Sequence, residues 1–286
     1  MSLNLSDART LFHRNLIDTN TLSIDASGVA SNADKSQKLS CELAVDIARA
    51  LGAPHGGEKL NGQRSGQNFE EAVGAFLSET FLALSSLRPG RWNVLNVGSS
   101  RRSHSLSQYE PYRHLDELAA AIIEKPALAA ILGNSYDISP DVLVVRQPIS
   151  QQELNDSGIV VDGVASYSPL LARNQSSPII HAVVSCKWTL RSDRAQNARS
   201  EALNLIRNRK GRTPHIVVVT GEPTPSRLSS LALGTGDIDT VYHFALPELI
   251  TATQDSGNDE AIKTLDTLVT GQRLRDIADL PLDLAV

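Results

Sequence analysis

Apolar residues recur every three or four positions along much of the chain, which is the spacing of one face of an α-helix. The first such stretch runs to about Leu16, with Ser6 as its expected N-cap. Later stretches end close to glycines or prolines, which break helices. We predict further helices at residues 34–52, 68–87, 112–126, 194–212 and 259–280.

Shorter apolar runs, rich in valine and isoleucine, predict strands. Within 141–222 the order is strand, strand, helix, strand, which requires at least one crossover. We therefore predict an α/β fold with helices flanking a central mixed β-sheet; the run at 241–250 would be the last strand, and the helix at 259–280 would cover it. The strands are expected at residues 91–98, 141–147, 179–190, 214–222 and 241–250.

The length of 286 residues suits one large domain better than two. No repeat or low-complexity linker divides the chain, so we expect residues 1–286 to form a single domain. It would have an N-terminal helical region and a core at about 130–225. The polar, glycine-rich stretch at 52–67 is predicted to be a loop.

The formal net charge of −5 argues against a protein that coats nucleic acid without specificity, because such proteins are basic throughout. The charge is unevenly distributed, however. Residues 187–212 hold eight basic and two acidic side chains and so carry +6, which leaves −11 for the remainder. This asymmetry predicts that one part of the protein binds a polyanion.

Cys41 and Cys186, the only cysteines, fall in a predicted helix and a predicted strand, and nothing suggests that they pair. Reduced thiols fit a reducing cytosol. The N-terminus lacks the apolar segment of a signal peptide, and no apolar run reaches the roughly 18 residues that a membrane span needs. We expect a cytoplasmic protein that does not enter a membrane.

The candidate active site begins with a lysine in the apolar strand at 179–190. Side chains alternate along a strand, so Lys187 shares one face with Ser185, and a buried ammonium there requires an anion. Asp141, which opens a neighbouring strand, and Glu201, on the following helix, are the candidate anions. Two carboxylates beside a lysine predict a Mg²⁺ site, because Mg²⁺ prefers hard oxygen ligands and completes its shell with waters and substrate phosphates.

The spacing of these residues resembles a known nuclease motif. Asp141 follows a proline, and "SCK" stands at 185–187, which is similar to the PD-(D/E)xK motif with Ser185 in place of the usual acidic residue. In the type II restriction endonucleases that cut sites with a CCGG core, that carboxylate comes from the following helix. Glu201 stands at the corresponding place.

Two further places carry the resemblance, the "RSDR" run at 191–194 and the dipeptide Phe69-Glu70 on an earlier helix. The resemblance implies a restriction-endonuclease-like fold and a Mg²⁺-dependent active site with two ions. Backbone oxygens also suit hard cations, so the Cys186 carbonyl joins the expected metal ligands. The expected catalytic residues are Asp141, Lys187, Glu201, Ser185 and Glu70, and the expected metal ligands are Asp141, Cys186 and Glu201.

The residue types of the "RSDR" run suit G·C base pairs. Arginine donates two hydrogen bonds to guanine, and aspartate accepts one from cytosine. We expect Arg191, Ser192, Asp193 and Arg194, at the start of a helix, to contact DNA in the major groove. The outer base pairs need other readers, and the candidates are Gln63 and Ser36, which lie in polar segments expected in or near loops.

The partner implied by the resemblance is double-stranded DNA with a palindromic CCGG-containing site, GCCGGC. A palindrome is most simply read by a symmetric dimer, and the resemblance extends this expectation to a dimer of dimers.

The main alternative is a regulator that reads G·C-rich palindromes without cutting them. Carboxylates beside a phosphate are costly unless a cation neutralises them, so the acidic set favours the nuclease. Single residues also have simpler interpretations. Lys187 could extend from a strand end, Asp141 could belong to a turn, and Glu70 could interact with a helix dipole. The seven histidines show no zinc spacing.

Overall fold

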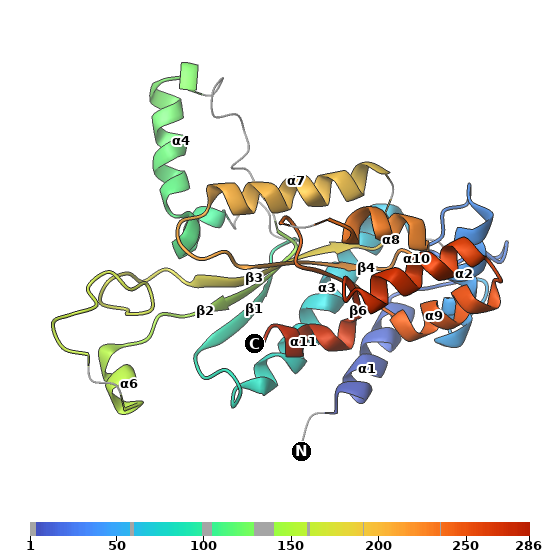
Figure 1. The fold of residues 1–286 in the computed structure, drawn as a ribbon, viewed down its shortest axis with the longest axis horizontal. Helices are drawn as coiled ribbons and strands as arrows, with labels where there is room; N and C mark the ends of the chain where they lie inside the picture. The colour runs from blue at the N-terminus through green and yellow to red at the C-terminus, as the bar shows by residue number, and fades with distance from the viewer. Residues whose placement is uncertain are drawn as a thin grey trace.

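A mixed β-sheet lies at the centre of the computed structural model (Figure 1). The structure describes residues 4–57, 60–98, 105–128, 140–158, 161–190, 192–234 and 236–286, without the side chains of 192–194. Among these residues the sheet has six strands, whose spatial order follows the sequence. The strands are β1 Trp92–Asn96, β2 Val142–Arg146, β3 Ile179–Lys187, β4 His215–Thr220, β5 Thr240–His243 and β6 Leu274–Asp276.

The direction of the strands decides which of their ends meet. β1, β2 and β3 pair antiparallel, whereas β3, β4, β5 and β6 pair parallel. The parallel pairing of β3 with β4 requires a crossover, which α7 (Ser192–Asn208) supplies. Val142 pairs with Asn96 and Val184, and Lys187 pairs with Thr220. The start of β2 and the ends of β1, β3 and β4 therefore lie together.

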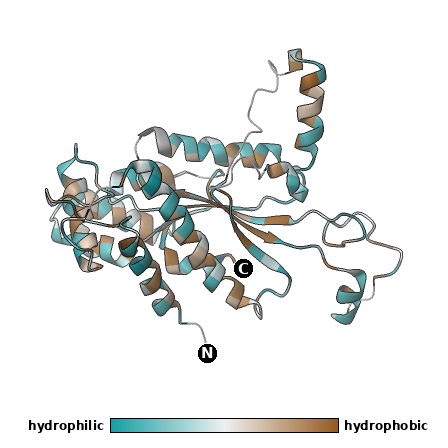
Figure 2. Cartoon of the chain, turned by 180° about the vertical axis from the view of Figure 1, so that it is seen from behind, coloured by the Kyte–Doolittle hydropathy of each residue, from teal (hydrophilic) through white to brown (hydrophobic). Residues whose placement is uncertain are grey.

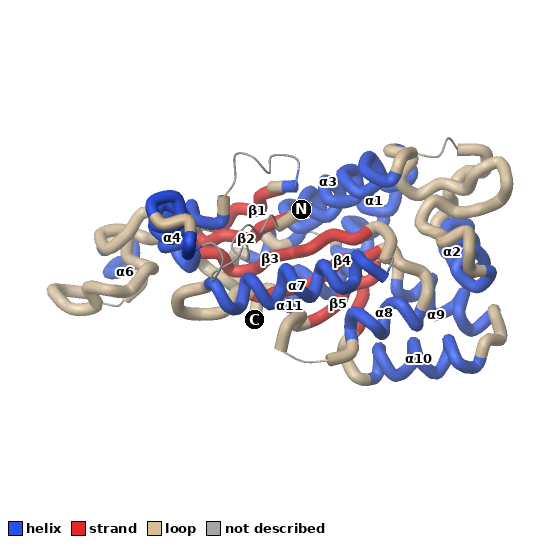
Figure 3. Tube along the Cα trace, turned by 90° about the horizontal axis from the view of Figure 1, so that it is seen from above, coloured by secondary structure: helices blue, strands red, loops and turns tan. Residues whose placement is uncertain are grey.

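Helices cover both faces of the sheet. α7 crosses one face, and α1 and α3 lie on the other (Figure 1). Seen from above, α2, α8, α9 and α10 gather beyond one end of the sheet, and α4 and α6 lie at the opposite end (Figure 3). The remaining helices are α1 Leu5–Asp18, α2 Lys38–Ala50, α3 Gly62–Thr80, α4 His114–Glu124, α6 Gln151–Asp156, α8 Pro225–Ala232, α9 Leu246–Asp255, α10 Asp259–Thr270 and α11 Leu280–Asp283, with short 3-10 turns η1 Leu82–Leu84, η3 Leu106–Gln108, η4 Glu110–Tyr112 and η5 Ile277–Asp279.

β3 is buried on both of its faces, as its near-continuous apolar sequence predicts. Ser185 lines a small cavity with Ala198 and Ala202 of α7, so the odd-numbered residues face this helix. Trp188, which follows β3, packs on Phe69 of α3 with ring centroids 5.0 Å apart. α7 is hydrophilic over much of its length, which fits a helix with one face on the sheet and one in solvent (Figure 2).

The predicted fold class and the two free cysteines are confirmed. No helix in the described part of the chain combines the length and apolarity that a membrane span requires.

Three predictions at the level of elements are wrong. The N-cap of α1 is Asn4, whose side chain accepts from the Ser6 N–H, and not Ser6 itself. The stretch at 52–67 is not a loop throughout, because the Asn61 side chain accepts from the Arg64 N–H at 2.8 Å and starts α3 at Gly62. The segment 241–250 is a strand only to His243, and α9 begins at Leu246 with a proline in its first turn.

The C-terminal region adds a strand that the apolar pattern did not indicate. The helix expected at 259–280 ends at Thr270, and β6 follows as a strand of 3 residues beside β5. A strand this short shows too few alternations to be recognised from periodicity. The sheet thus runs from β1 to β6 and extends on both sides of the core expected at about 130–225.

Candidate active site

Asp141 is held rigidly where β1, β2 and β3 meet. Its backbone carbonyl accepts from the N–H groups of Val97 and Gly98 at 2.9 and 3.1 Å. Its side chain, only 3% exposed, accepts through Oδ2 from the Cys186 backbone N–H at 2.7 Å. Because three strands fix its backbone and its carboxylate, the aspartate is positioned before any ligand arrives.

Lys187 lies between the two predicted carboxylates. Its Nζ is 3.2 Å from Asp141 Oδ2 and 4.0 Å from Glu201 Oε2. Burial opposes the charged ammonium, but the attraction of Asp141 and Glu201 outweighs this cost, so the pKa of Lys187 is raised above its ordinary value. The Glu201 side chain is 44% exposed, so the group is open on the side of α7.

Ser185 lies one alternation before Lys187 and faces the same helix. It lines a small cavity with Glu201 and Pro140. Its Oγ is buried and has no hydrogen-bond partner among the described residues. A buried hydroxyl without a partner costs free energy, so this atom fits a site that is completed by a ligand.

Glu70 of α3 approaches the same place across Gly98. A Cβ built on Gly98 would lie 2.0 Å from Glu70 Oε2 and 3.7 Å from the Asp141 Cα. The glycine therefore leaves the space that the glutamate carboxylate occupies. Burial, together with the charges of Asp141 and Glu70, raises the pKa of the Cys186 thiol, which keeps this cysteine protonated.

These side chains suit Mg²⁺ better than zinc. Among the described residues, no group of three or more His, Cys, Asp or Glu side chains could hold a metal ion, so a metal here would depend on other ligands as well. Asp141 and Glu201 approach one ammonium from two elements. Two carboxylates with a nearby backbone carbonyl are a typical protein contribution to Mg²⁺, whose remaining ligands are waters and phosphate oxygens. The donor set and the unpartnered Ser185 hydroxyl fit the predicted ion.

The structure brings together Asp141, Ser185, Lys187 and Glu201, with Glu70 behind Gly98. It does not test the base-reading residues in the same way. Arg191 lies outside the described residues, and so do the side chains of Ser192, Asp193 and Arg194. The backbone of 192–194 begins α7, as expected for the start of a helix.

The predicted outer readers lie on separate elements. Ser36 is exposed in the loop before α2, and its N–H and hydroxyl donate to Asp34 Oδ1 at 3.0 and 2.8 Å. Gln63 is exposed in the first turn of α3 rather than in a loop.

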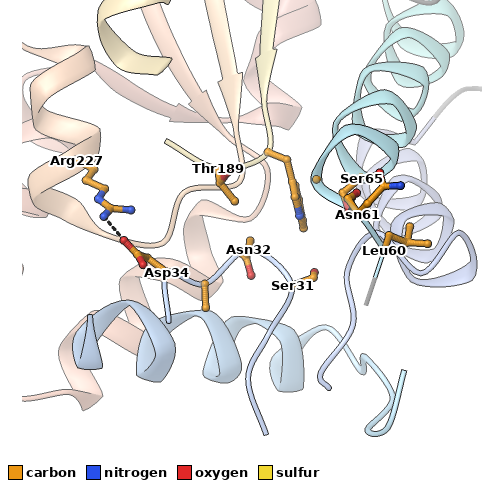
Figure 4. A pocket seen from close by; sticks show the side chains of 11 residues that line it. Ser31, Asn32, Asp34, Leu60, Asn61, Ser65, Thr189 and Arg227 are labelled. Atoms are coloured by element: carbon orange, nitrogen blue, oxygen red, sulfur yellow. Dashed lines mark hydrogen bonds and ion pairs between the residues drawn. The ribbon is translucent and has the colours of Figure 1, made fainter. Parts of the chain in front are cut away.

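An ion pair that the sequence did not reveal lies beside the end of β3. Arg227 of α8 pairs with Asp34, and both line a cavity of about 560 Å³ that Thr189 and Asn32 also line (Figure 4). The same pair lines a second cavity of about 670 Å³ with Ser36. Residues 34 and 227 are 193 positions apart, so only the residue types, an aspartate and an arginine, could have signalled a role in base reading.

A buried glutamate connects this ion pair to Leu190, just before α7. Glu222 is 1% exposed and accepts from the backbone N–H of Leu190 at 2.9 Å and of Thr224 at 3.1 Å. Arg227 Nη1 lies 3.7 Å from the same carboxylate. Burial raises the pKa of Glu222, although these hydrogen bonds and Arg227 favour its charged form.

Comparisons with known proteins show the family of the chain. The model of the family described as NgoMIV restriction enzyme matches residues 12–286. The type II restriction enzyme NgoMIV of Neisseria gonorrhoeae is 52% identical over 279 residues, 97% of each chain.

Two solved structures also align. A PspGI–substrate DNA complex covers 99% of this chain and 92% of its own at 12% identity and a TM-score of 0.28. The Bse634I complex with cognate DNA covers 96% and 92% at 15% identity and a TM-score of 0.32. At these scores the two alignments support no argument about function.

The protein is therefore a type II restriction endonuclease, a class of site-specific deoxyribonucleases that bind and cut DNA. The chain belongs to the NgoMIV restriction enzyme family.

Proposed function

We propose that this protein is a Mg²⁺-dependent endonuclease that cuts double-stranded DNA at GCCGGC and leaves 5′-phosphate ends. The observation that carries the proposal is the convergence of Asp141 and Glu201 on Lys187, at 3.2 and 4.0 Å. The acids come from different elements, and a general DNA-binding protein would have no use for them beside a phosphate. The identity to a type II restriction enzyme over 97% of the chain supports the same reaction.

Asp141, Glu201 and the Cys186 carbonyl would hold the metal, with two ions per active site. When bound, Mg²⁺ supplies positive charge that offsets the charge developing on the phosphate. Asp141 keeps its place because the Cys186 N–H holds its carboxylate. Glu201, more exposed, can adjust to the substrate.

Lys187 orients the attacking water and offsets charge in the transition state. Its ammonium is fixed between two carboxylates, so it needs little reorganisation when DNA binds. Ser185 contributes a hydroxyl that has no partner in the described structure, and Glu70 contributes negative charge from behind Gly98. Water attacks the phosphorus in line with the leaving 3′-oxygen: the new P–O bond forms on the 5′-phosphate as the bond to the 3′-oxygen breaks, the attacking water gives up a proton to solvent, and the leaving oxygen takes up a proton to become a 3′-hydroxyl.

Arg191, Asp193 and Arg194 would read the inner G·C pairs, with Ser192 among them at the start of α7. We assign the outer G·C pair to Arg227 and Asp34. An arginine donating to guanine and an aspartate accepting from the paired cytosine is the same chemistry, and both side chains line the two cavities beside the end of β3. Ser36 and Gln63 would add contacts from the flanking elements.

A palindromic target is matched by a two-fold symmetric assembly, so the working form would be a dimer or a dimer of dimers. Sedimentation of the protein with and without a GCCGGC duplex measures this directly.

The test of the function is cleavage of a plasmid that contains a single GCCGGC, with Mg²⁺ or with EDTA. We expect linear plasmid only with Mg²⁺, and ligation of the mapped ends shows whether they carry 5′-phosphates. A plasmid in which the site is changed to GACGTC is the matched control and should stay intact. Specific binding without cutting under every metal condition would instead favour the regulator.

A further inference from the structure

Another cavity, lined by several cationic side chains, lies at the opposite end of β3 from the proposed active site. It has a volume of about 350 Å³ and opens between the β2–β3 connection and the chain just before β4. Arg88 and Arg146 line its inner part, and Lys210 and Arg212 are exposed at its rim. His181, at its floor, is six residues before Lys187 on the same strand, so the two ends are roughly 20 Å apart.

The cations in this cavity outnumber the acidic residues that line it. None of Arg88, Arg146, Lys210 and Arg212 forms an ion pair within 4.0 Å of a carboxylate in the described parts of the chain. Glu110 is the one acidic residue among those lining the cavity, and it offsets part of the charge of Lys210 through space. Burial first, and then Arg212 and Arg146, lower the pKa of the Arg88 guanidinium. The cluster therefore destabilises itself by like-charge repulsion.

Partly buried arginines elsewhere in the protein do have carboxylate partners. Arg9 pairs with Glu248 and Asp276, and Arg199 pairs with Asp237 at 2.6 Å. Their side chains are only 18% and 28% exposed, so they resemble Arg88 and Arg146 in burial but have carboxylate partners.

The arginines of the cavity are held in place by neutral groups instead. The guanidinium carbons of Arg88 and Arg146 lie 5.7 and 5.4 Å from the centroid of the Trp92 ring. Arg88 donates to the Leu284 carbonyl at 2.9 Å, and Arg146 donates to the Pro89 carbonyl at 3.2 Å. These contacts fix the guanidinium groups but leave most of their charge uncompensated.

His181 completes the floor as a neutral group. Its Nε2 lies 2.8 Å from both the Leu284 carbonyl and Arg88 Nη1, and its Nδ1 lies 3.1 Å from Arg212 Nη2. Burial lowers the pKa of His181 to about 3, so the imidazole is neutral. The floor is therefore a ring that contacts both Arg88 and Arg212 without adding further charge.

We propose that this cavity binds a phosphate-class oxyanion, either free phosphate or a backbone phosphate of DNA that lies away from the active site. Two fixed guanidinium groups and two exposed cations surround a space large enough for a phosphate with its waters. Planar guanidinium groups match the oxygens of such an anion, and its charge would remove the repulsion within the cluster.

The test is the affinity of the full chain for inorganic phosphate, measured from its melting temperature in phosphate and in sodium chloride of equal ionic strength. We expect phosphate far above its Kd to raise the melting temperature by about 5 °C, because the ligand binds only the folded state. Arg146→Gln and Lys210→Gln should each raise the Kd at least about fivefold. Arg49→Gln, an exposed arginine on α2, is the matched control and should behave like the parent.

Lys210 is exposed at the rim, so Lys210→Gln gives an answer even if Arg146→Gln does not fold. Equal phosphate affinity in the parent and Lys210→Gln, or no difference between phosphate and chloride in the parent, overturns the proposal. Binding of a duplex without CCGG separates the two sources. Weaker binding by Lys210→Gln with a smaller salt dependence indicates a DNA phosphate, and unchanged binding indicates a free anion.

The molecular mass of each variant in solution completes the test. A smaller assembly for Lys210→Gln than for the parent would mean that carboxylates of a second copy of the chain fill the cavity, which also overturns the proposal.

Discussion

At the scale of single residues, the proposed active site depends on a few atoms placed to within ångströms. Lys187 is held by two carboxylates, and Asp141 is held by the Cys186 N–H. Removing an atom that acts only in the transition state affects the reaction rate much more than it affects binding.

Lys187→Ala should reduce the cleavage rate of a GCCGGC duplex by at least about a thousandfold while DNA affinity changes little. In the proposed mechanism the ammonium acts on the developing charge, and the inner base contacts come from other residues. Single-turnover cleavage and a gel-shift titration measure the two quantities. Lys263→Ala, an exposed lysine on α10, is the control. Cleavage near the parental rate would remove Lys187 from the mechanism.

Gly98→Ala tests the place of Glu70. The new methyl group would lie 2.0 Å from Glu70 Oε2, so the carboxylate must move from its present place. We expect cleavage to fall by about tenfold or more with a smaller effect on the melting temperature. Gly66→Ala is the control. Gly66 lies on α3, the helix that carries Glu70; a Cβ there meets nothing within 4 Å, so the change should be neutral or stabilising. Unchanged cleavage in Gly98→Ala would mean that Glu70 has no part in the reaction.

Arg227→Lys tests the assignment of the outer base pair. A lysine keeps the charge but cannot donate two parallel hydrogen bonds to guanine. The preference for GCCGGC over ACCGGT, as a ratio of kcat/KM values, should fall by a factor that corresponds to roughly 1–3 kcal/mol. The corresponding ratio of kcat/KM values for substitutions at the inner base pairs should not change. An equal loss at all positions would assign Arg227 to a phosphate contact instead.

At the scale of elements, Glu222 connects the segment before α7 to the end of β4 and to α8. This carboxylate lies beyond β4 and accepts from the Leu190 N–H just before α7 begins, with Arg227 of α8 beside it. The loop after β3, the start of α7 and α8 therefore share one buried anchor.

Glu222→Ala should lower the free energy of unfolding by about 1–3 kcal/mol, because the Leu190 N–H loses its acceptor inside the protein. Glu222→Gln keeps an oxygen at the same place and should lose less. Urea unfolding followed by circular dichroism gives both values. Equal stability of Glu222→Ala and the parent would show that water replaces the carboxylate without cost.

At the scale of the whole molecule, stability depends on pH through buried histidines. Burial lowers the pKa of His243 to about 4 and that of His181 to about 3. Both values lie below the roughly 6.5 of an exposed histidine, so the folded state binds these protons less readily than the unfolded state does. The resulting stability is complete above about pH 6.5 and is lost as the pH falls through that value toward the folded pKa.

His243→Asn should therefore flatten the fall in unfolding free energy between about pH 6.5 and pH 4, by up to ~1.4 kcal/mol per pH unit. In the parent, the Ala245 N–H donates to His243 Nδ1 at 3.1 Å. The asparagine oxygen can still accept this hydrogen bond. His55→Asn, at an exposed position, is the control. An identical slope in His243→Asn and the parent would contradict the buried neutral imidazole.

The sequence by itself determined the local features of this protein. Alternation placed Ser185 and Lys187 on one face of β3, and helical spacing placed Glu201 on α7. These follow from chain geometry over a few residues, which periodicity records. The succession of strand, strand, helix and strand within 141–222, with at least one crossover, could be predicted for the same reason, and the crossover lies between β3 and β4.

Only the tertiary structure decided which distant groups meet. The Asp141 carboxylate accepts from an N–H that is 45 residues away, and Arg227 pairs with an aspartate 193 residues away. Neither contact changes the local pattern of apolar and polar residues, because single hydrogen bonds between separate elements have no period along the chain. The same holds for β6, whose 3 residues form a strand only because β5 presents an open edge to them.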